Sequence, residues 1–243
     1  MKKEWFAEWF DSPYYHQLYK SRDDNEAKSV LDNLLIALNL SAGSRVLDLA
    51  CGKGRHSRYL SEKGFDVTGL DISPASIQFA RQFEHERLAF YQHDMRKPFR
   101  VNYFDAVMNM FTSFGYFKKD ADHLLALKNV ATNLRPGGLF LLDFLNANFV
   151  RQNLLRSEEK TVDNITFQIK RWVRNGYVFK SVEFQTGGRL FHFQEQVRLF
   201  GLADFQSLLA SAGMRLDQTY GSYDLSSFDE KNSKRLIFIA QKY

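Results

Sequence analysis

The residues best placed to do chemistry lie in the stretch VLDLACGKGRHS, which covers residues 46–57. An apolar run reaches Asp48 and then enters a turn. In that turn the side chains are small or absent at Ala50, Gly52 and Gly54. Small residues let a ligand approach the backbone, and glycine tolerates the left-handed conformations of a tight turn. A carboxylate beside such a turn suits a positively charged ligand better than a polyphosphate, so the stretch predicts a site for a cationic small molecule.

Two further acids follow at the ends of later apolar runs. Asp71, followed by Ile72, closes the run VTGLDIS, and Asp94 precedes Met95 in the segment HDM. A carboxylate about twenty residues after a glycine turn is placed to accept both hydroxyls of a ribose. Asp94 offers an acceptor for the adenine amino group, and the soft side chain of Met95 suits the face of the ring. These residues predict an adenosine-type ligand.

Two common nucleotide-binding patterns fit this turn poorly. The dinucleotide pattern G-x-G-x-x-G finds Gly52 and Gly54 but meets Ser57 where the third glycine belongs. The phosphate-binding loop G-x-x-x-x-G-K-[ST] does not occur in the sequence. A nicotinamide-dinucleotide-binding protein with the same kind of sheet therefore stays an alternative and is not the preferred hypothesis.

The elements that must position these residues alternate between β-rich and helical segments over residues 28–146, which predicts an α/β protein with a parallel sheet and helices on both faces. Because the carboxyl ends of parallel strands meet at one edge of a sheet, Asp48, Asp71 and Asp94 are expected to lie close together. Strands are expected at 45–51, 66–73, 88–95, 103–111 and 138–146, and helices at 27–40, 55–64, 74–86 and 120–134.

The pattern changes after residue 146. Residues 161–200 alternate in short β-like pieces around Asn175-Gly176 and Gly187-Gly188, which are strong hairpin turns. A helix at 202–213 and strands at 214–221 and 234–242 then resume the α/β pattern. The sequence thus divides into an N-terminal helical lid or cap, an α/β core, an antiparallel β insertion and a C-terminal completion of the core, at residues 1–40, 41–150, 151–200 and 201–243.

Composition narrows the range of partners. The 243 residues are 44% hydrophobic and 25% charged, with a net charge of +5 and no sustained basic block, which argues against a nucleic-acid partner. No stretch approaches the roughly 20 apolar residues of a membrane span. The single cysteine, Cys51, has no intramolecular disulfide partner, so a cytoplasmic location is expected. No metal is expected at the site.

The chain resembles the class I S-adenosylmethionine-dependent methyltransferases of the small-molecule type. VLDLACGKGRHS resembles the glycine-rich first motif of that family, VTGLDIS the acidic second motif, and HDM with YFDAVMNMF the third and fourth, and LRPGG before the fifth strand is a further typical segment. The family pattern has a glycine where this sequence has Ala50. The resemblance implies a Rossmann-like, doubly wound, seven-stranded sheet whose last strand is antiparallel, and S-adenosyl-L-methionine as the cofactor.

The resemblance also implies roles for individual residues. The first motif would wall the methionine portion of the cofactor, Asp71 would hold the ribose, and Asp94 with Met95 would hold the adenine. Asn109 and Met110 would lie beneath the methionyl chain and the sulfonium. The residues assigned to the first motif are Asp48, Ala50, Gly52 and Gly54.

The methyl acceptor is less clearly written in the sequence. The stretch Asn109-Met110-Phe111-Thr112 lacks the prolines typical of enzymes that methylate exocyclic amines of bases, and no Pro-Cys for cytosine-5 chemistry follows the fourth strand. The preferred acceptor is a small organic molecule with a nitrogen, oxygen or carbon nucleophile. Methylation of RNA by another route stays open as an alternative.

Aromatic residues suggest how an acceptor pocket would be closed. The N-terminal stretch WFAEWFDSPYYHQLY contains Tyr14, Tyr15 and Tyr19, which in related small-molecule methyltransferases would close over the methionyl end. Packing of a helix against the sheet is the competing interpretation of these aromatics. The insertion would form either the wall of the acceptor site or a homodimer contact.

Two catalytic candidates come from these segments. Tyr15 is one, and His192 is the other, with Glu195 beside it as a second base candidate. In a strand His192 and Glu195 point to opposite faces, so both reach one pocket only across a bulge. The competing interpretation of His192 is a cross-strand surface residue. His16 is a further, weaker candidate for a base.

Overall fold

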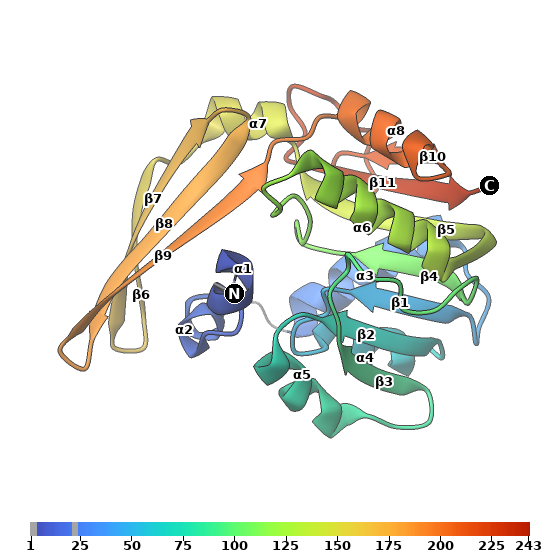
Figure 1. The fold of residues 1–243 in the computed structure, drawn as a ribbon, viewed down its shortest axis with the longest axis horizontal. Helices are drawn as coiled ribbons and strands as arrows, with labels where there is room; N and C mark the ends of the chain where they lie inside the picture. The colour runs from blue at the N-terminus through green and yellow to red at the C-terminus, as the bar shows by residue number, and fades with distance from the viewer. Residues whose placement is uncertain (1–3, 21–23) are drawn as a thin grey trace.

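The computed structural model describes residues 4–20 and 24–243, and its main body is a seven-stranded sheet (Figure 1). The strands are β1 Arg45–Leu49, β2 Asp66–Asp71, β3 Leu88–Gln92, β4 Phe104–Asn109, β5 Leu134–Leu145, β10 Met214–Tyr220 and β11 Arg235–Lys242. Their order across the sheet is β10-β11-β5-β4-β1-β2-β3. The strands from β5 to β3 in this order pair in parallel, whereas β11 is antiparallel to β5. The expected α/β fold with an antiparallel last strand is confirmed.

Helices cover both faces of this sheet because alternate residues of its buried strands point to opposite layers. Val46 packs in a core with Leu34 of helix α3 (Asp24–Leu38), whereas its neighbour Leu47 packs in a core with Leu127. Helices α4 (Arg55–Glu62) and α5 (Pro74–Ala80) share the face of α3, and α6 (Asp120–Asn133) and α8 (Leu202–Ser211) share the other. Within the described ranges no helix is long and apolar enough to cross a membrane.

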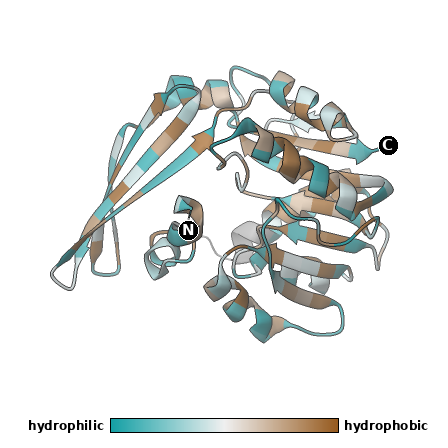
Figure 2. Ribbon diagram, in the orientation of Figure 1, coloured by the Kyte–Doolittle hydropathy of each residue, from teal (hydrophilic) through white to brown (hydrophobic). Residues whose placement is uncertain are grey.

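The insertion folds as a separate antiparallel sheet beside this body (Figure 1). Its strands are β6 Ser157–Val162, β7 Ile165–Arg174, β8 Tyr177–Thr186 and β9 Arg189–Arg198, in that order across the sheet. Asn175-Gly176 and Gly187-Gly188 form the two predicted hairpin turns, and all four of these residues have positive φ angles. Figure 2 shows polar and apolar residues alternating along these strands, as expected for a sheet with one solvated face.

Two short helices of the N-terminal segment lie between the two sheets (Figure 1). They are α1 (Trp5–Trp9) and α2 (Pro13–Leu18), and Ser12 caps α2 by accepting a hydrogen bond from the backbone N–H of Tyr14. Trp9 and Leu18 are buried in a core that includes Phe167 and Val182 of the insertion. Residues 1–3 and 21–23 of the expected segment 1–40 lie outside the described residues.

Several elements differ from the sequence prediction, among them β6, which begins at Ser157, before the predicted β region 161–200. Helix α5 ends at Ala80, and a 3-10 turn, η1 (Arg81–Phe83), follows it, because Glu84 adopts an extended backbone and its carboxylate accepts a hydrogen bond from Phe90 N at 2.7 Å. Strand β5 starts at residue 134 because Leu134 already pairs with Phe104. The short helix α7 (Ala147–Asn153), which leads into the insertion, was not predicted.

Candidate active site

A cavity opens at the carboxyl edge of the central sheet, where β1, β2 and β3 end, and helices α1 and α2 form its opposite wall. We call it the inner pocket. The empty space within its outline, open solvent at the mouth included, amounts to about 750 Å³. It is lined by Phe6, Phe10, Tyr15, His16, Leu49, Ala50, Gly52, Leu70, Asp71, Ile72, Ser76, His93, Asp94, Met95, Ser113, Tyr116 and Phe117.

A second cavity, the outer pocket, adjoins the inner one. The two pockets lie side by side, because they share the lining residues Tyr15, His16, Ala50, Gly52, Ser113 and Tyr116. The remaining lining of the outer pocket is Tyr19, Lys20, Cys51, Lys53, Arg55, His56, Met110 and Phe111. The inner pocket is thus bounded mainly by apolar side chains and two carboxylates, whereas cationic side chains gather around the outer pocket.

The two glycines of the turn, Gly52 and Gly54, have different roles. Ala50, Gly52 and Gly54 have φ angles of 64°, 56° and 79°, so all three positions use the left-handed region. A Cβ atom at Gly52 would meet nothing within 4 Å, and Gly52 lines both pockets. A Cβ atom at Gly54 would come within 2.5 Å of the Phe90 ring, and Gly54 lines neither pocket. Gly52 leaves room for a ligand, whereas Gly54 is required by packing.

Asp71 ends β2 and faces the inner pocket. Its Oδ2 accepts a hydrogen bond from Gly52 N at 2.8 Å, and its Oδ1 accepts one from Ser73 N at 2.8 Å. Burial raises the pKa of Asp71 in spite of these bonds. Each carboxylate oxygen has two acceptor sites, so both can still accept a hydrogen bond from a ligand. The side chain therefore holds the glycine turn and presents acceptors to the cavity.

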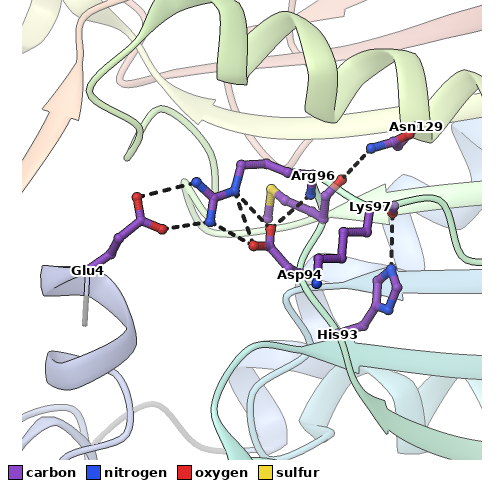
Figure 3. Close-up of polar contacts among 7 residues, drawn as sticks. Glu4, His93, Asp94, Arg96, Lys97 and Asn129 are labelled. Atoms are coloured by element: carbon purple, nitrogen blue, oxygen red, sulfur yellow. Dashed lines mark hydrogen bonds and ion pairs between the residues drawn. The ribbon is translucent and has the colours of Figure 1, made fainter. Parts of the chain in front are cut away.

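Asp94 lies after β3 and is bound to Arg96 (Figure 3). The Arg96 guanidinium lies 2.7 Å from Asp94 Oδ2, and it reaches Glu4 just before α1 at 2.6 Å. Burial alone would raise the pKa of Asp94, but the hydrogen bonds and charge of Arg96 lower it below its usual value. Asp94 therefore stays ionised at the pocket wall, and Arg96 joins that wall to the N-terminal helices.

Asp48 is buried behind the glycine turn, with 1% of its surface exposed, and it lines neither pocket. Its Oδ2 accepts a hydrogen bond from Ser57 Oγ at 2.6 Å. Burial raises the pKa of Asp48 to about 6. Asp48, the first of the three predicted acids, therefore does not reach the cavity.

Asn109 ends β4 and Met110 follows it, but only one of the two side chains reaches the cavity. Met110 lines the outer pocket, whereas Asn109 is fully buried and lines neither pocket. The Asn109 amide donates a hydrogen bond to the carbonyl oxygen of Leu49 at 2.8 Å, which joins β4 to the end of β1. Its Oδ1 has no hydrogen-bond partner among the described residues.

The three predicted tyrosines occupy different places. Tyr15 lines both pockets, and Tyr19 lines the outer one and contacts Lys180 of β8. Tyr14 lines neither, because its ring packs between Phe184 and Phe191 of the insertion at 4.7 and 4.8 Å. The structure therefore brings Tyr15 and Tyr19 to the cavity and places Tyr14 in the packing of α2.

The strand β9 places His192 away from both pockets. The side chain is 53% exposed and pairs with Glu183 at 2.9 Å. On the other face of the strand, Glu195 accepts a hydrogen bond from Trp9 Nε1 at 2.7 Å. The opposite orientation predicted for His192 and Glu195 is thus confirmed.

His16, the weaker candidate, lines both pockets. Its Nε2 lies 3.4 Å from Ser76 Oγ. Burial, with a further contribution from the charge of Lys53, lowers the pKa of His16 to about 4. The imidazole is therefore uncharged at neutral pH.

The comparisons with known proteins agree with this geometry. Residues 46–138 match the family of methyltransferase domains. A dTDP-3-amino-3,4,6-trideoxy-alpha-D-glucopyranose N,N-dimethyltransferase of Streptomyces venezuelae is 27% identical over 205 residues, 81% of this chain and 85% of that protein. The crystal structure of an S-adenosylmethionine-dependent methyltransferase from Clostridium acetobutylicum superposes with a TM-score of 0.78 at 20% identity, over 94% of this chain and 96% of the other.

A third similar protein was solved with its cofactor. SAM-bound CalS10, an amino pentose methyltransferase from Micromonospora echinaspora, superposes with a TM-score of 0.71 at 22% identity, over 96% of this chain and 98% of that chain. Residues 46–138 thus form a methyltransferase domain, and the chain has the fold of the S-adenosylmethionine-dependent methyltransferases, as its motifs predict.

The described residues fit this cofactor on three observations. The open space in front of Gly52 is where a bulky cofactor can approach the backbone, and Asp71 retains acceptors for the ribose hydroxyls. Apolar side chains, including Leu70, Ile72 and Met95, provide walls for an aromatic base.

Several lining residues escaped the sequence prediction. Ser113 and Tyr116 follow β4 and line both pockets, and Phe6 and Phe10 come from α1 and the residue after it. Arg96, which lines neither pocket but binds Asp94, could have been suspected because it follows Asp94 by two residues in HDMRK. The others carry no spacing signal, since loops and short helices bring them to the cavity.

Proposed function

We propose that the protein transfers a methyl group to a nitrogen, oxygen or carbon nucleophile of a small organic acceptor bound in the outer pocket. The observation that carries this proposal is that the two pockets share lining residues and so lie side by side. Tyr15, His16, Ser113 and Tyr116 border both, so a cofactor in the inner pocket and an acceptor in the outer pocket would meet at these side chains.

Among the three kinds of nucleophile we favour an amine nitrogen. The Streptomyces venezuelae relative is an N,N-dimethyltransferase of an amino sugar, and a glycine N-methyltransferase of Rattus norvegicus is 35% identical over 122 residues, 44% of this chain. An amine must be neutral to react, and a neutral amine needs alignment more than a dedicated base. Burial lowers the pKa of His16, so the imidazole at the junction of the pockets adds no further cation to those that border the outer pocket.

The chemistry of the step divides between cofactor and protein. S-adenosylmethionine supplies, when bound, a methyl group on a positively charged sulfur. The protein would bind the cofactor and the acceptor and align them for the transfer. Asp71 would accept hydrogen bonds from the ribose, Asp94 and Met95 would hold the adenine with Ile72 beside them, and the rings of Tyr15 and Tyr116 would exclude water from the junction.

We propose Tyr15 as the residue nearest the reacting atoms and do not assign a role in the reaction to His192. Tyr15 borders both pockets, whereas His192 is exposed on β9 and paired with Glu183. Tyr19 and Met110 would contact the acceptor side of the cavity. Asp48, Asn109, Gly54 and Tyr14 would support the site from behind, since none of them lines a pocket.

Calorimetric titration with S-adenosylhomocysteine tests the proposal. We expect the wild type to bind this compound and to show no response to nicotinamide dinucleotides. Asp71→Asn replaces one carboxylate oxygen by an amide NH₂ group, which cannot accept hydrogen bonds from the ribose hydroxyls or from the glycine turn. The Kd of this variant for S-adenosylhomocysteine should therefore rise by about ten- to a hundredfold. Asp217→Asn, which alters an ion pair with Arg215 on β10, is the matched control and should bind like the wild type. Binding that is equal in Asp71→Asn and the wild type would remove Asp71 from the site.

We further propose that two copies associate through the sheet of the insertion. Trp172 and Val173 at the β7–β8 hairpin are exposed, and β6 leaves one edge of the sheet unpaired within the described chain. Exposed apolar residues beside an open strand edge are typical of association sites. Light scattering after size-exclusion chromatography would show a dimer, and a monomer at micromolar concentration would contradict this proposal.

We also propose a cytoplasmic location. Cys51 is the one cysteine of the sequence, and it is buried as a free thiol. Free buried cysteines persist in reducing compartments. Fractionation of cells with an antibody against the protein would test this location.

A further inference from the structure

The turn that follows β4 has an unusual backbone. Phe111 and Thr112 have φ angles of 54° and 61°, so two consecutive residues with full side chains adopt the left-handed region. Bulky and β-branched residues rarely enter this region, and such conformations persist only where the surrounding structure enforces them. Something in the fold must therefore hold this turn.

A buried carboxylate provides the backbone contacts. Asp143 of β5 is fully buried, and its Oδ2 accepts a hydrogen bond from Phe111 N at 2.8 Å. The backbone carbonyl of the same residue accepts one from Thr112 N at 2.9 Å. Tyr223 adds a hydrogen bond from its hydroxyl to Asp143 Oδ2 at 2.8 Å. Both amides of the strained turn are thus bound to one residue of the neighbouring strand.

Arg235 of the last strand closes the network. Its guanidinium lies 2.6 Å from Asp143 Oδ1, and its Nη2 donates to Thr112 Oγ1 at 2.9 Å. The antiparallel pairing of β11 with β5 sets Ile237 opposite Asp143, which places Arg235 on the same face of β11, diagonal to the carboxylate. The antiparallel strand therefore brings an arginine to a turn 123 residues earlier in the chain.

The turn leads directly to the cavity. The Tyr116 hydroxyl donates to the carbonyl oxygen of Thr112 at 2.5 Å, and Ser113 and Tyr116 line both pockets. The Tyr116 ring also contacts Phe10 at 5.2 Å, next to α1. A change in the backbone at Thr112 would therefore move the side chains at the junction of the two pockets.

We propose that Arg235 and Asp143 are positioning residues of the methyltransferase site, which hold Phe111 and Thr112 in the left-handed conformation and thereby set Ser113 and Tyr116 at the cavity. The role rests on the proposed function, because it assigns these residues to the cofactor and acceptor pockets. Neither Arg235 nor Asp143 lines a pocket, so they act through Thr112.

The first test measures the turn itself, without ligand. In Arg235→Met the amides of Phe111 and Thr112 should exchange with deuterium at least about tenfold faster than in the wild type, because the turn has lost one of its supports. Arg235→Lys keeps the positive charge but not the forked geometry of the guanidinium, so its exchange rates should lie between those of Arg235→Met and the wild type. Thr112→Val, which removes only the hydroxyl acceptor, provides a milder variant should Arg235→Met fail to fold. Unchanged exchange in the variants would overturn the proposal.

The second test measures the site by calorimetry with S-adenosylhomocysteine. The Kd should rise by about tenfold in Arg235→Met, and glycine at position 112, which adopts positive φ without support, should restore most of that loss in Arg235→Met/Thr112→Gly. Arg215→Met, which breaks an exposed ion pair on β10, is the control and should match the wild type.

The outcomes separate two kinds of failure. A lowered Tm with unchanged exchange and unchanged affinity in Arg235→Met would mean a purely structural ion pair and would overturn the positioning role. A wild type that binds no S-adenosylhomocysteine would instead refute the proposed function, and the exchange measurement would still decide whether Arg235 holds the turn.

Discussion

Three carboxylates end or follow the first three strands, and their surroundings give them different tasks. Asp71 faces the cavity with acceptor capacity left over, and Asp94 faces it while bound to Arg96. Asp48 is buried behind the turn and bonded to Ser57. Because burial disfavours the ionised form, the pKa values of Asp48 and Asp71 are raised, whereas Arg96 lowers that of Asp94.

The pKa of Asp48, raised by burial to about 6 from its usual 3.8, predicts a pH-dependent stability. A folded-state pKa above the unfolded value means that the contribution of Asp48 is fully present below pH 3.8 and is lost as pH rises through about 6. Asp48→Asn stays neutral. Its free energy of unfolding, relative to that of the wild type, should therefore rise by up to about 3 kcal/mol between pH 3.5 and pH 8.

Urea unfolding of both proteins at several pH values, without ligand, measures this difference. Asp66→Asn, at the start of β2, serves as the control for loss of a carboxylate elsewhere on the sheet. If the free energies of unfolding of Asp48→Asn and the wild type differed by the same amount at every pH, the raised pKa of the buried Asp48 would be contradicted.

Gly52 and Gly54 form a matched pair for a second prediction. Both have positive φ angles, so alanine strains both positions by about 1 kcal/mol. At Gly54 the new Cβ also meets the Phe90 ring, so Gly54→Ala should lower the free energy of unfolding by a further 1 to 3 kcal/mol, roughly. At Gly52 the Cβ enters the cavity, so Gly52→Ala should mainly weaken binding of S-adenosylhomocysteine. Equal losses of stability in the two variants would contradict these separate roles.

At the scale of elements, the short N-terminal helices are held from both sides. Glu4 before α1 pairs with Arg96 of the central domain, and Asp11 accepts a hydrogen bond from Ser73 Oγ at 2.7 Å. On the other side, Trp9 donates to Glu195 of the insertion. Helices of five and six residues are unstable alone, so these contacts and the aromatic core hold them over the cavity.

The ion pair between Glu4 and Arg96 leads to a prediction for the rate at which a ligand dissociates from the cavity (Figure 3). Because Glu4 is 44% exposed, the pair contributes little to global stability. Glu4→Ala should leave Tm unchanged and should accelerate dissociation of S-adenosylhomocysteine by about two- to fivefold in stopped-flow measurements. Glu8→Ala alters an exposed acid on the same helix, for which no ion pair occurs among the described residues, and is the control. The same dissociation rate in Glu4→Ala and Glu8→Ala would show that the ion pair does not hold the N-terminal helices over the ligand.

At the scale of the whole molecule, local patterns were enough to predict the core. Apolar runs that end in Asp48 and Asp71 define buried parallel strands, and Asn-Gly and Gly-Gly turns define the hairpins of the insertion. Such signals depend on neighbours in the chain, so a single sequence contains them.

Contacts between distant segments could not be predicted in the same way. Arg96 binds Glu4 across 92 positions, Trp9 binds Glu195 across 186, and Arg235 binds Asp143 across 92. Each side chain has many partners of suitable charge in the sequence, and only the assembled layers select one. For the same reason the sequence predicts that His192 and Glu195 lie on opposite faces of a strand, but not which face packs against the N-terminal helices. That choice depends on how the insertion packs against α1 and α2.

The central claim is that the tips of β1, β2 and β3 bind a sulfonium nucleoside in the inner pocket. A crystal structure of the protein grown with S-adenosylhomocysteine tests it most directly. We predict the ribose hydroxyls within hydrogen-bond distance of the Asp71 carboxylate, with the adenine beside Met95. Density for the ligand at another place, or crystals without it at saturating concentration, would contradict the claim.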